Sequence, residues 1–226
     1  METHLKAYLK TQDQEALHRF RVQVKKIKAL LTLSGKGNPH AKLNPRFKPV
    51  KKVFSKAGEL RNAYISGQLA LQQRQPTSKP ARKFRARGTK YLKAIRMARR
   101  PIKKKLSPIH LNTLRQFYES QLQRIAAGLE GQPSAEQLHN CRKRIKILLY
   151  NYPLVQGELT FELDTAYLDS LQETIGNWHD QWIAGKFADK PLPPTSLFAP
   201  NFYQRAIRQP NQIISHPNHD MAPTTI

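Results

Sequence analysis

The sequence predicts an all-α protein made of two pseudo-symmetric helical bundles that arise from an internal repeat. Two observations carry this prediction. Apolar residues from Glu15 to Leu33 recur with the 3.6-residue period of a helix, and the same pattern returns 121 residues later. Glycine and proline residues delimit further helical segments in both halves. The second half has fewer such segments, so we expect its bundle to be truncated after Ala184.

The repeated segment combines an apolar face with a basic stripe. The first copy places these apolar residues on one side of a helical wheel: Leu17, Phe20, Val24, Ile27 and Leu31. The second copy repeats them as Leu138, Cys141, Ile145, Leu148 and Tyr152. Beside this face, His18, Arg21 and Lys25 return as His139, Arg142 and Lys146. Lys28 alone has no basic counterpart, because Leu149 takes its place.

Caps and breakers delimit the other helices. Thr11 or Asp13 can cap the first repeated helix, and Gly35 and Gly37 should end it near Ser34, ahead of a basic loop over 35–48. Pro101 should kink or end the third long helix. In order, the expected helices span about 3–10, 15–34, 49–73, 81–100, 107–129, 135–153 and 162–184. A proline-rich tail follows at 191–226, with one short helix near 199–208.

Positive charge is concentrated in the first half of the chain. The protein has 39 Lys and Arg residues against 15 Asp and Glu residues, a formal net charge of +24. Residues 1–105 contain 29 of the basic residues and 4 of the acidic ones. Repulsion among so many positive charges destabilises the folded state, and their electrostatic field concentrates anions near the protein. We therefore expect a polyanionic partner.

The sequence indicates neither a membrane segment nor a disulfide. No apolar run approaches the roughly 20 residues that cross a bilayer, and the first residues lack the apolar core of a secretory signal. The single cysteine, Cys141, lies on the apolar face of the second repeated helix, where we expect a core residue. We therefore expect a cytoplasmic protein without a membrane partner.

A glycine motif follows the repeated helix in each half. Ala57-Gly58-Glu59-Leu60-Arg61-Asn62 aligns with Ile175-Gly176-Asn177-Trp178-His179-Asp180. We expect the glycines to let two helices approach closely. For Asp180 we expect an orienting role, because a carboxylate on a neighbouring helix would fix the rotamer of Arg142.

The basic stripe has the chemistry of a phosphate-binding surface. His18, Arg21 and Lys25 lie within roughly 60° of one another along about 10 Å of helix. One arginine can donate hydrogen bonds to two phosphate oxygens, lysine acts as a point charge, and histidine donates a hydrogen bond from a ring nitrogen. A single basic stripe is usually just the solvent-exposed face of a helix. Here the stripe recurs at the same helical-wheel positions in both halves, which favours a functional surface. Two copies related by a pseudo-twofold axis would line one groove.

The order and duplication of these motifs carry a resemblance to a known family. His18-x-x-Arg21-Val22-x-x-Lys25-x-x-Lys28 and Leu138-His139-x-x-Arg142-Lys143-x-x-Lys146, each followed by the glycine motif, resemble the CHAD domain, the conserved-histidine α-helical domain. The resemblance places such a domain at residues 11–190, with halves at about 11–131 and 132–190. It implies two related helical bundles that bind inorganic polyphosphate through basic residues around a central channel.

Carried over by position, the resemblance implies a set of anion contacts: His18, Arg21, Lys25, Lys28, His139, Arg142 and Lys146. To these we add basic residues of the second and third long helices: Arg61, Lys93 and Arg96. Leu149 and Asn62 depart from the family pattern, which usually has a basic residue and Asp there. Association with polyphosphate granules is a further expectation, whereas nothing in the sequence indicates a protein partner.

Two other functions remain open. Non-specific DNA or RNA binding also suits a basic protein, although single-strand binders interleave aromatic residues with the basic ones. A phosphohydrolase acting on polyphosphate would need acidic residues to hold metal ions, and the few in the first half form no paired motif. We expect neither catalysis nor a cofactor or metal site. Each histidine should be largely neutral in the free protein and gain a proton when the anion binds.

Overall fold

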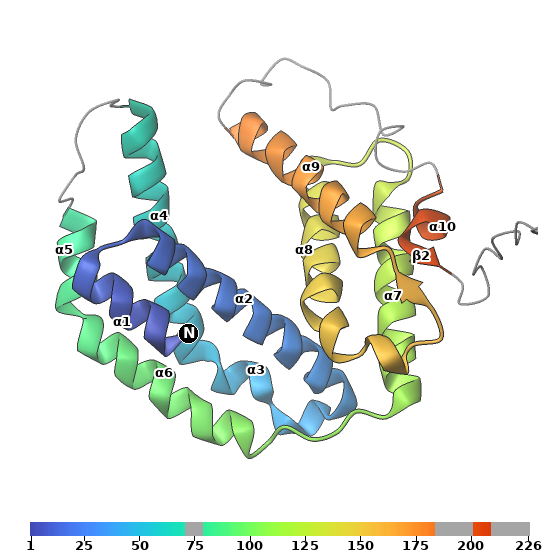
Figure 1. Ribbon diagram of the computed structural model, residues 1–226, viewed down its shortest axis with the longest axis horizontal. Coiled ribbons are helices and arrows are strands. Elements are labelled where there is room, and N and C mark those ends of the chain that lie inside the picture. Colours follow the sequence, from blue (N-terminus) through green and yellow to red (C-terminus); the bar gives the residue numbers. More distant parts are fainter. Residues whose placement is uncertain (71–78, 184–200, 209–226) are drawn as a thin grey trace, which may run out of the picture.

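The computed structural model (Figure 1) describes residues 1–70, 79–183 and 201–208 of the chain. These residues are almost entirely helical, which confirms the expected all-α class. The first helices are α1 (Glu2–Thr11), α2 (Gln14–Gly37), α3 (Leu43–Arg46), α4 (Lys48–Ala70), α5 (Lys79–Ala86) and α6 (Gly88–Lys103). They are followed by α7 (Leu111–Leu129), α8 (Ala135–Asn151), α9 (Thr165–Ile183) and α10 (Phe202–Ala206). The other elements are the 3₁₀ turns η1 (Pro39–Ala41), η2 (Tyr152–Leu154) and η3 (Gln156–Glu158) and the strands β1 (Glu162–Leu163) and β2 (Ile207–Arg208).

Buried apolar side chains form two clusters. The first joins side chains of α1 to α6, among them the fully buried Phe20 and Phe47. The second joins side chains of α7 to α10, among them Tyr118 and Ile145. Leu33 of α2 belongs to the second cluster, so the two cores meet at α2. A pseudo-twofold relation between the two parts stays a prediction.

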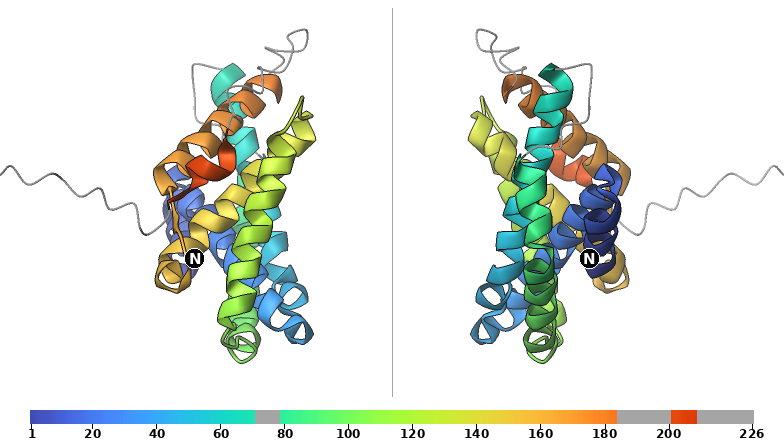
Figure 2. Two further views of the ribbon diagram at one scale, coloured as in Figure 1. Left: turned by 90° about the vertical axis from the view of Figure 1, so that its right-hand side faces the viewer. Right: turned by 90° about the vertical axis from the view of Figure 1, so that its left-hand side faces the viewer.

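Packing assigns α7 to the second part of the molecule. The sequence placed the division between residues 131 and 132, but Leu114, Tyr118 and Leu122 of α7 are buried in the second cluster. α7 packs along α8, and Figure 2 shows it on the flank of the molecule beside that helix. The cores therefore divide the chain between α6 and α7. We call the parts on either side of that point the first and second lobes.

Part of the expected tail packs onto the second lobe. Phe202 and Ala206 of α10 are buried in its core. Strand β2 pairs antiparallel with β1, and Nη2 of Arg208 lies 2.7 Å from Oδ2 of Asp164. Residues 191–200 and 209–226 of the expected tail lie outside the described residues.

Several helix boundaries differ from the sequence prediction. α2 continues through Gly35 to Gly37, and the expected loop over 35–48 contains η1 and α3. The expected helix over 81–100 is divided into α5 and α6 at Arg87, and Pro101 lies inside α6. The division coincides with a close approach to α1, because a Cβ atom on Gly88 would lie 2.9 Å from the methyl carbons of Leu9.

α7 begins at Leu111 rather than at Ser107-Pro108. The residues before it run across the end of α2. Nδ2 of Asn38 donates to Oγ of Ser107 at 3.4 Å, and the side chain of Ile109 would lie 3.2 Å from a Cβ atom on Gly37. These contacts hold the connection to the second lobe in an irregular conformation, so the local capping signal at Ser107 is not used.

Candidate anion-binding site

Local capping and burial orient the two repeated helices. The carboxylate of Asp13 accepts hydrogen bonds from the backbone N–H groups of Glu15 and Ala16, at 3.0 Å each, and so begins α2. Ser134 and Gln137 form a reciprocal capping box at the start of α8. The predicted apolar faces are buried as Leu17, Phe20, Val24 and Leu31 in α2 and as Leu138, Cys141, Ile145, Leu148 and Tyr152 around α8. Ile27 is only partly buried.

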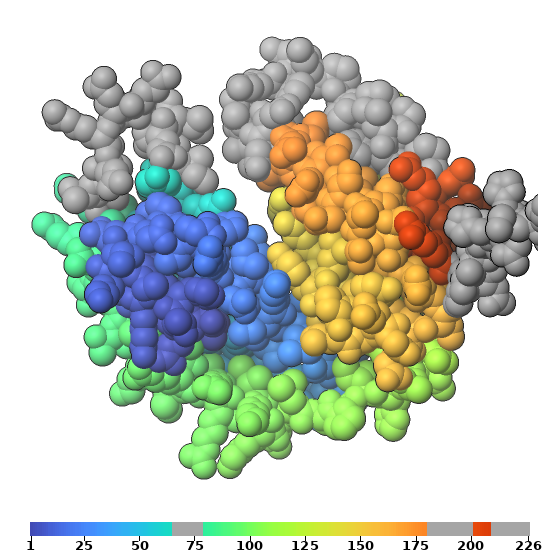
Figure 3. Space-filling view, in the orientation of Figure 1, coloured from blue at the N-terminus to red at the C-terminus, as the bar shows by residue number. Residues whose placement is uncertain are grey.

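α2 and α8 pack against each other, with the C-terminal end of α8 beside Ala29 of α2. Nδ2 of Asn151, a fully buried side chain, donates to the carbonyl oxygen of Ala29 at 3.1 Å. Figure 3 shows a cleft between the two lobes, with α2 and α4 on one side and α8 and α9 on the other. The basic stripes precede the Asn151–Ala29 junction in both helices.

Cations from the two lobes lie close together where α2 faces α8. Burial, followed by the charges of Lys146 and other nearby cations, lowers the pKa of Lys25 from 10.5 to about 8. Burial and Arg142 also lower the pKa of Lys146. We call the residues linked by such interactions the basic cluster: His18, Arg21, Lys25, Arg61, His139, Arg142 and Lys146.

His18 is paired with Arg61 of α4. Nη1 of Arg61 lies 2.8 Å from Nδ1 of His18. A guanidinium only donates, so Nδ1 accepts and the neutral ring carries its proton on Nε2. Burial and then Arg61 lower the pKa of His18. The direction agrees with the sequence prediction, but burial is a larger cause than the neighbouring cations.

In the second lobe a second histidine takes the place of Arg61. The rings of His139 and His179 stack with their centroids 5.1 Å apart and their planes 24° apart. His179 aligns with Arg61 in the glycine motif. Burial lowers the pKa of His139, and Lys143 and His179 add to the effect. Nδ1 of His139 is buried without a hydrogen-bond partner in the described part of the chain, so its environment disfavours a further proton.

Arg21 rests on α4 over a glycine. Its Nη1 donates to the carbonyl oxygen of Phe54 at 3.4 Å, and its guanidinium carbon lies 4.7 Å from the centroid of the Phe54 ring. A Cβ atom on Gly58 would lie only 2.5 Å from that Nη1. Gly58 therefore makes room for the arginine side chain, whereas the sequence analysis expected it to make room for a helix backbone.

Arg142 rests on α9 in the same way. Its Nε donates to the carbonyl oxygen of Gln172 at 2.9 Å, and a Cβ atom on Gly176 would lie 2.6 Å from its Nη2. In both lobes the accepting carbonyl belongs to the residue four positions before the glycine. We call each of these contacts an arginine seat. Asp180, the expected orienting residue, belongs to α9, but its side chain lies outside the described residues.

The sequence was compared with models of known families, with curated proteins and with solved structures. The family model of the CHAD domain matches residues 1–189. The chain belongs to the CHAD domain family. No curated protein and no solved structure matched it. CHAD domains are associated with polyphosphate binding or metabolism. The matched range includes α1, which the sequence analysis placed ahead of the domain.

Three expected contact residues of the CHAD domain lie apart from the basic cluster. Lys28 is exposed beside α4, where burial and its charge lower the pKa of Lys51. Lys93 and Arg96 are exposed on α6, which packs against α1 and α4. Nη2 of Arg96 forms an ion pair with Oε1 of Glu2 at 2.8 Å. Lys93 and Arg96 therefore lie away from the cleft, whereas Lys28 stays an exposed residue of α2 beside α4.

Some neighbours of the CHAD domain's basic cluster were not identified from the sequence. They are His179, which stacks on His139, and the carboxylates of Asp169 and Glu173, which partly oppose the lowered pKa of Lys146. A signal for each was present. His179 aligns with Arg61, and Asp169, Glu173 and Gly176 are spaced as residues on one face of a helix.

None of the helices in residues 1–70, 79–183 and 201–208 combines the length and the hydropathy required to cross a bilayer.

Proposed function

We propose that this CHAD domain binds inorganic polyphosphate in the cleft between its lobes and does not hydrolyse it. The observation that carries the proposal is the effect of Lys146, in the second repeated helix, on the pKa of Lys25, in the first. Cations held together in this way repel one another in the free protein. A bound polyanion would remove that repulsion, so the arrangement favours a ligand with many closely spaced negative charges.

A linear chain of phosphates suits the geometry of the basic cluster. A guanidinium has five N–H donors, so each seated arginine keeps donors for phosphate oxygens after bonding its main-chain carbonyl. Lys25 and Lys146 act as point charges between the arginines. Binding would release counterions from the polymer, so affinity should fall steeply as salt is added.

The proposal is of binding alone. Transfer or hydrolysis of phosphoryl groups usually depends on metal ions held by acidic residues. Within the described ranges, no group of three or more His, Cys, Asp or Glu side chains is placed to hold a metal ion. Incubation with long-chain polyphosphate and Mg²⁺ tests this part of the proposal, which expects no release of phosphate. A protein with this property would collect on polyphosphate granules in the cell.

A binding titration with polyphosphate of defined length, at two salt concentrations, tests the proposal. Lys25→Met should weaken binding about tenfold, as expected for the loss of one charged hydrogen bond. Lys26→Met is the matched control, because Lys26 is exposed on the same helix. Lys146→Met should weaken binding to a similar extent, because the charge of Lys146 acts on Lys25 from α8.

Two results would contradict the proposal. Equal losses in the Lys25 and Lys26 variants would mean that the cleft is not the binding surface. Duplex DNA that displaces polyphosphate at equal phosphate concentration would favour the nucleic-acid alternative.

A further inference from the structure

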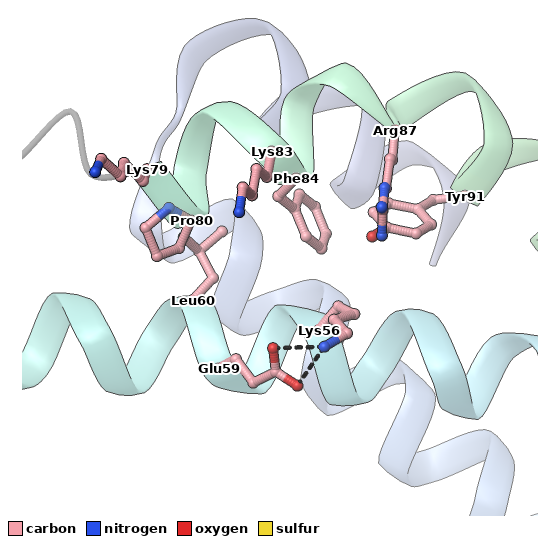
Figure 4. Close-up of a pocket in the computed structure, with 9 residues that line it drawn as sticks. All are labelled: Lys56, Glu59, Leu60, Lys79, Pro80, Lys83, Phe84, Arg87 and Tyr91. Carbon is pink, nitrogen blue, oxygen red and sulfur yellow. Dashed lines mark hydrogen bonds and ion pairs between the residues drawn. The ribbon is translucent and has the colours of Figure 1, made fainter.

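A second basic pocket lies on the outer side of the first lobe, between α4 and the α5–α6 segment (Figure 4). Its volume is about 410 Å³, within the usual range of small-molecule sites. It is lined by Lys56, Glu59, Leu60, Lys79, Pro80, Lys83, Phe84, Arg87 and Tyr91. We call it the α4–α5 pocket.

One edge of the α4–α5 pocket is a row of cations. Lys79, Lys83 and Arg87 follow one another at intervals of four residues, and all three are exposed. Figure 4 shows Lys83 and Arg87 pointing toward α4. No carboxylate of the described residues pairs with any of the three, whereas Lys56 is bound by Glu59 at 2.8 Å. Like charges at this spacing repel, so a bound anion would stabilise the row.

The floor of the α4–α5 pocket is apolar and partly aromatic. Phe84 and Tyr91 lie with their ring centroids 4.8 Å apart, and Phe84 also makes an edge contact with Tyr8, with centroids 5.8 Å apart. Leu60 and Pro80 complete the floor. Inorganic phosphate chains have no apolar part to place on such a surface. A ligand that uses the whole pocket must carry both an anionic group and a flat or apolar group.

The α4–α5 pocket is separate from the cleft because α4 lies between them. Phe54, Gly58 and Arg61 occupy the face of α4 that contacts α2. Glu59 and Leu60, which line the pocket, lie on other sides of the helix. A ligand in the pocket therefore touches no residue of the basic cluster.

We propose that the α4–α5 pocket binds a nucleotide. Its phosphates lie along Lys79, Lys83 and Arg87, and its base lies against the ring of Tyr91 and the apolar floor. Aromatic side chains stack with any base, so this contact selects nucleotides over inorganic phosphates without selecting one base. This inference does not depend on polyphosphate binding in the cleft.

The first test compares three probes by isothermal titration calorimetry at low salt, on the full chain carrying Lys25→Met and Lys146→Met, so that pyrophosphate binding in the cleft is weakened. ADP carries both groups, pyrophosphate carries the anion alone, and adenosine carries the base alone. ADP is expected to bind at least about tenfold more tightly than either fragment, because only ADP contacts both parts of the pocket. Pyrophosphate binding as tightly as ADP, or no binding of ADP, would overturn the proposal.

The second test locates the ADP site. Lys83→Met should weaken ADP binding about tenfold, whereas Arg82→Met, at an exposed neighbour outside the pocket, should not. Tyr91→Leu should reduce the preference for ADP over pyrophosphate, with circular dichroism confirming that the variant is folded. Lys25→Met should leave ADP binding unchanged even where it impairs polyphosphate binding. ADP binding that is lost in the Lys25 variant but kept in the Lys83 variant would place ADP in the cleft and refute the inference.

Discussion

Arg21 and Arg142 each join two helices in addition to carrying a positive charge. Arg21 bonds a carbonyl of α4 and Arg142 bonds a carbonyl of α9. Replacing either arginine by alanine would therefore remove a contact between helices together with a charge. The glycines beneath them offer a cleaner test, because changing a glycine moves the guanidinium without removing its charge.

We expect Gly58→Ala to weaken polyphosphate binding by about threefold to tenfold, because its Cβ atom would displace Nη1 of Arg21. Alanine stabilises a helix by about 1 kcal/mol relative to glycine. This gain offsets part of the folding stability that is lost when the arginine moves. Gly35→Ala is the control, since nothing lies within 4 Å of a Cβ atom there. Titration with polyphosphate should give a lower affinity for Gly58→Ala than for Gly35→Ala. Equal affinities would show that the arginine seat is not needed for binding.

The histidines predict a pH dependence of binding. The pKa values of His18 and His139 lie below the ordinary 6.5, chiefly because of burial. A phosphate chain favours the protonated rings and the protonated amine of Lys25, whose pKa is about 8, so affinity should increase as the pH falls from 8 towards 6. The histidines account for the part of this change below about pH 7. Titrations at fixed ionic strength measure it, and a flat profile in the native protein, or an unchanged slope below pH 7 in the double variant His18→Gln, His139→Gln, would contradict the expectation.

Each repeated helix packs one face into a hydrophobic core and lines the cleft with another. Its sequence pattern predicted both faces, because the 3.6-residue period decides which side chains share a face. The ends of neighbouring helices were less predictable. The division at Arg87 and the late start of α7 coincide with contacts to α1 and α2, which lie far away in the sequence.

The buried faces of the repeated helices should determine stability rather than affinity. Phe20 and Ile145 have no exposed surface. Replacing either by alanine is expected to lower the free energy of unfolding by about 2–5 kcal/mol, through lost apolar burial and the cavity that remains. Urea denaturation followed by circular dichroism measures the change, with Lys26→Met as an exposed control. A loss below about 1 kcal/mol would contradict the assignment of these residues to the two cores.

At the scale of the whole molecule, apolar contacts join the lobes while charge opposes their approach. Leu33 extends from α2 into the second core, and Asn151 bonds to α2 beside it. The basic cluster gathers cations of both lobes near this junction. The free protein therefore carries a cost that a polyanion would remove, and this cost should be visible in its stability.

We expect the free protein to become more stable as the pH rises from about 8 to 10.5. Lys25 has a pKa of about 8 when folded and an ordinary value of 10.5, so the unfolded chain binds more protons in this window. The destabilisation of the folded protein by the charged Lys25 side chain is fully present below pH 8. Because this ammonium group is partly solvated, we discount the destabilisation to about 1 kcal/mol.

Thermal melts of the native protein and of Lys25→Met measure this contribution. The variant should melt about 2–4 °C higher at pH 7 and should show a smaller rise above pH 8. A variant that melts lower than the native protein at pH 7 would mean that Lys25 stabilises the free fold.

The sequence by itself determined the helical class, the two faces of each repeated helix and the basic character of the first part of the chain. These features depend on periodicity and composition, which act within one helix. Tertiary structure alone decided that α7 joins the second core, that Arg61 reaches His18, and that a glycine seats each arginine. It also placed Lys93 and Arg96 on α6, apart from the basic cluster. Such relations depend on how close two helices come, and a distance between residues far apart in the chain has no local signal in the sequence.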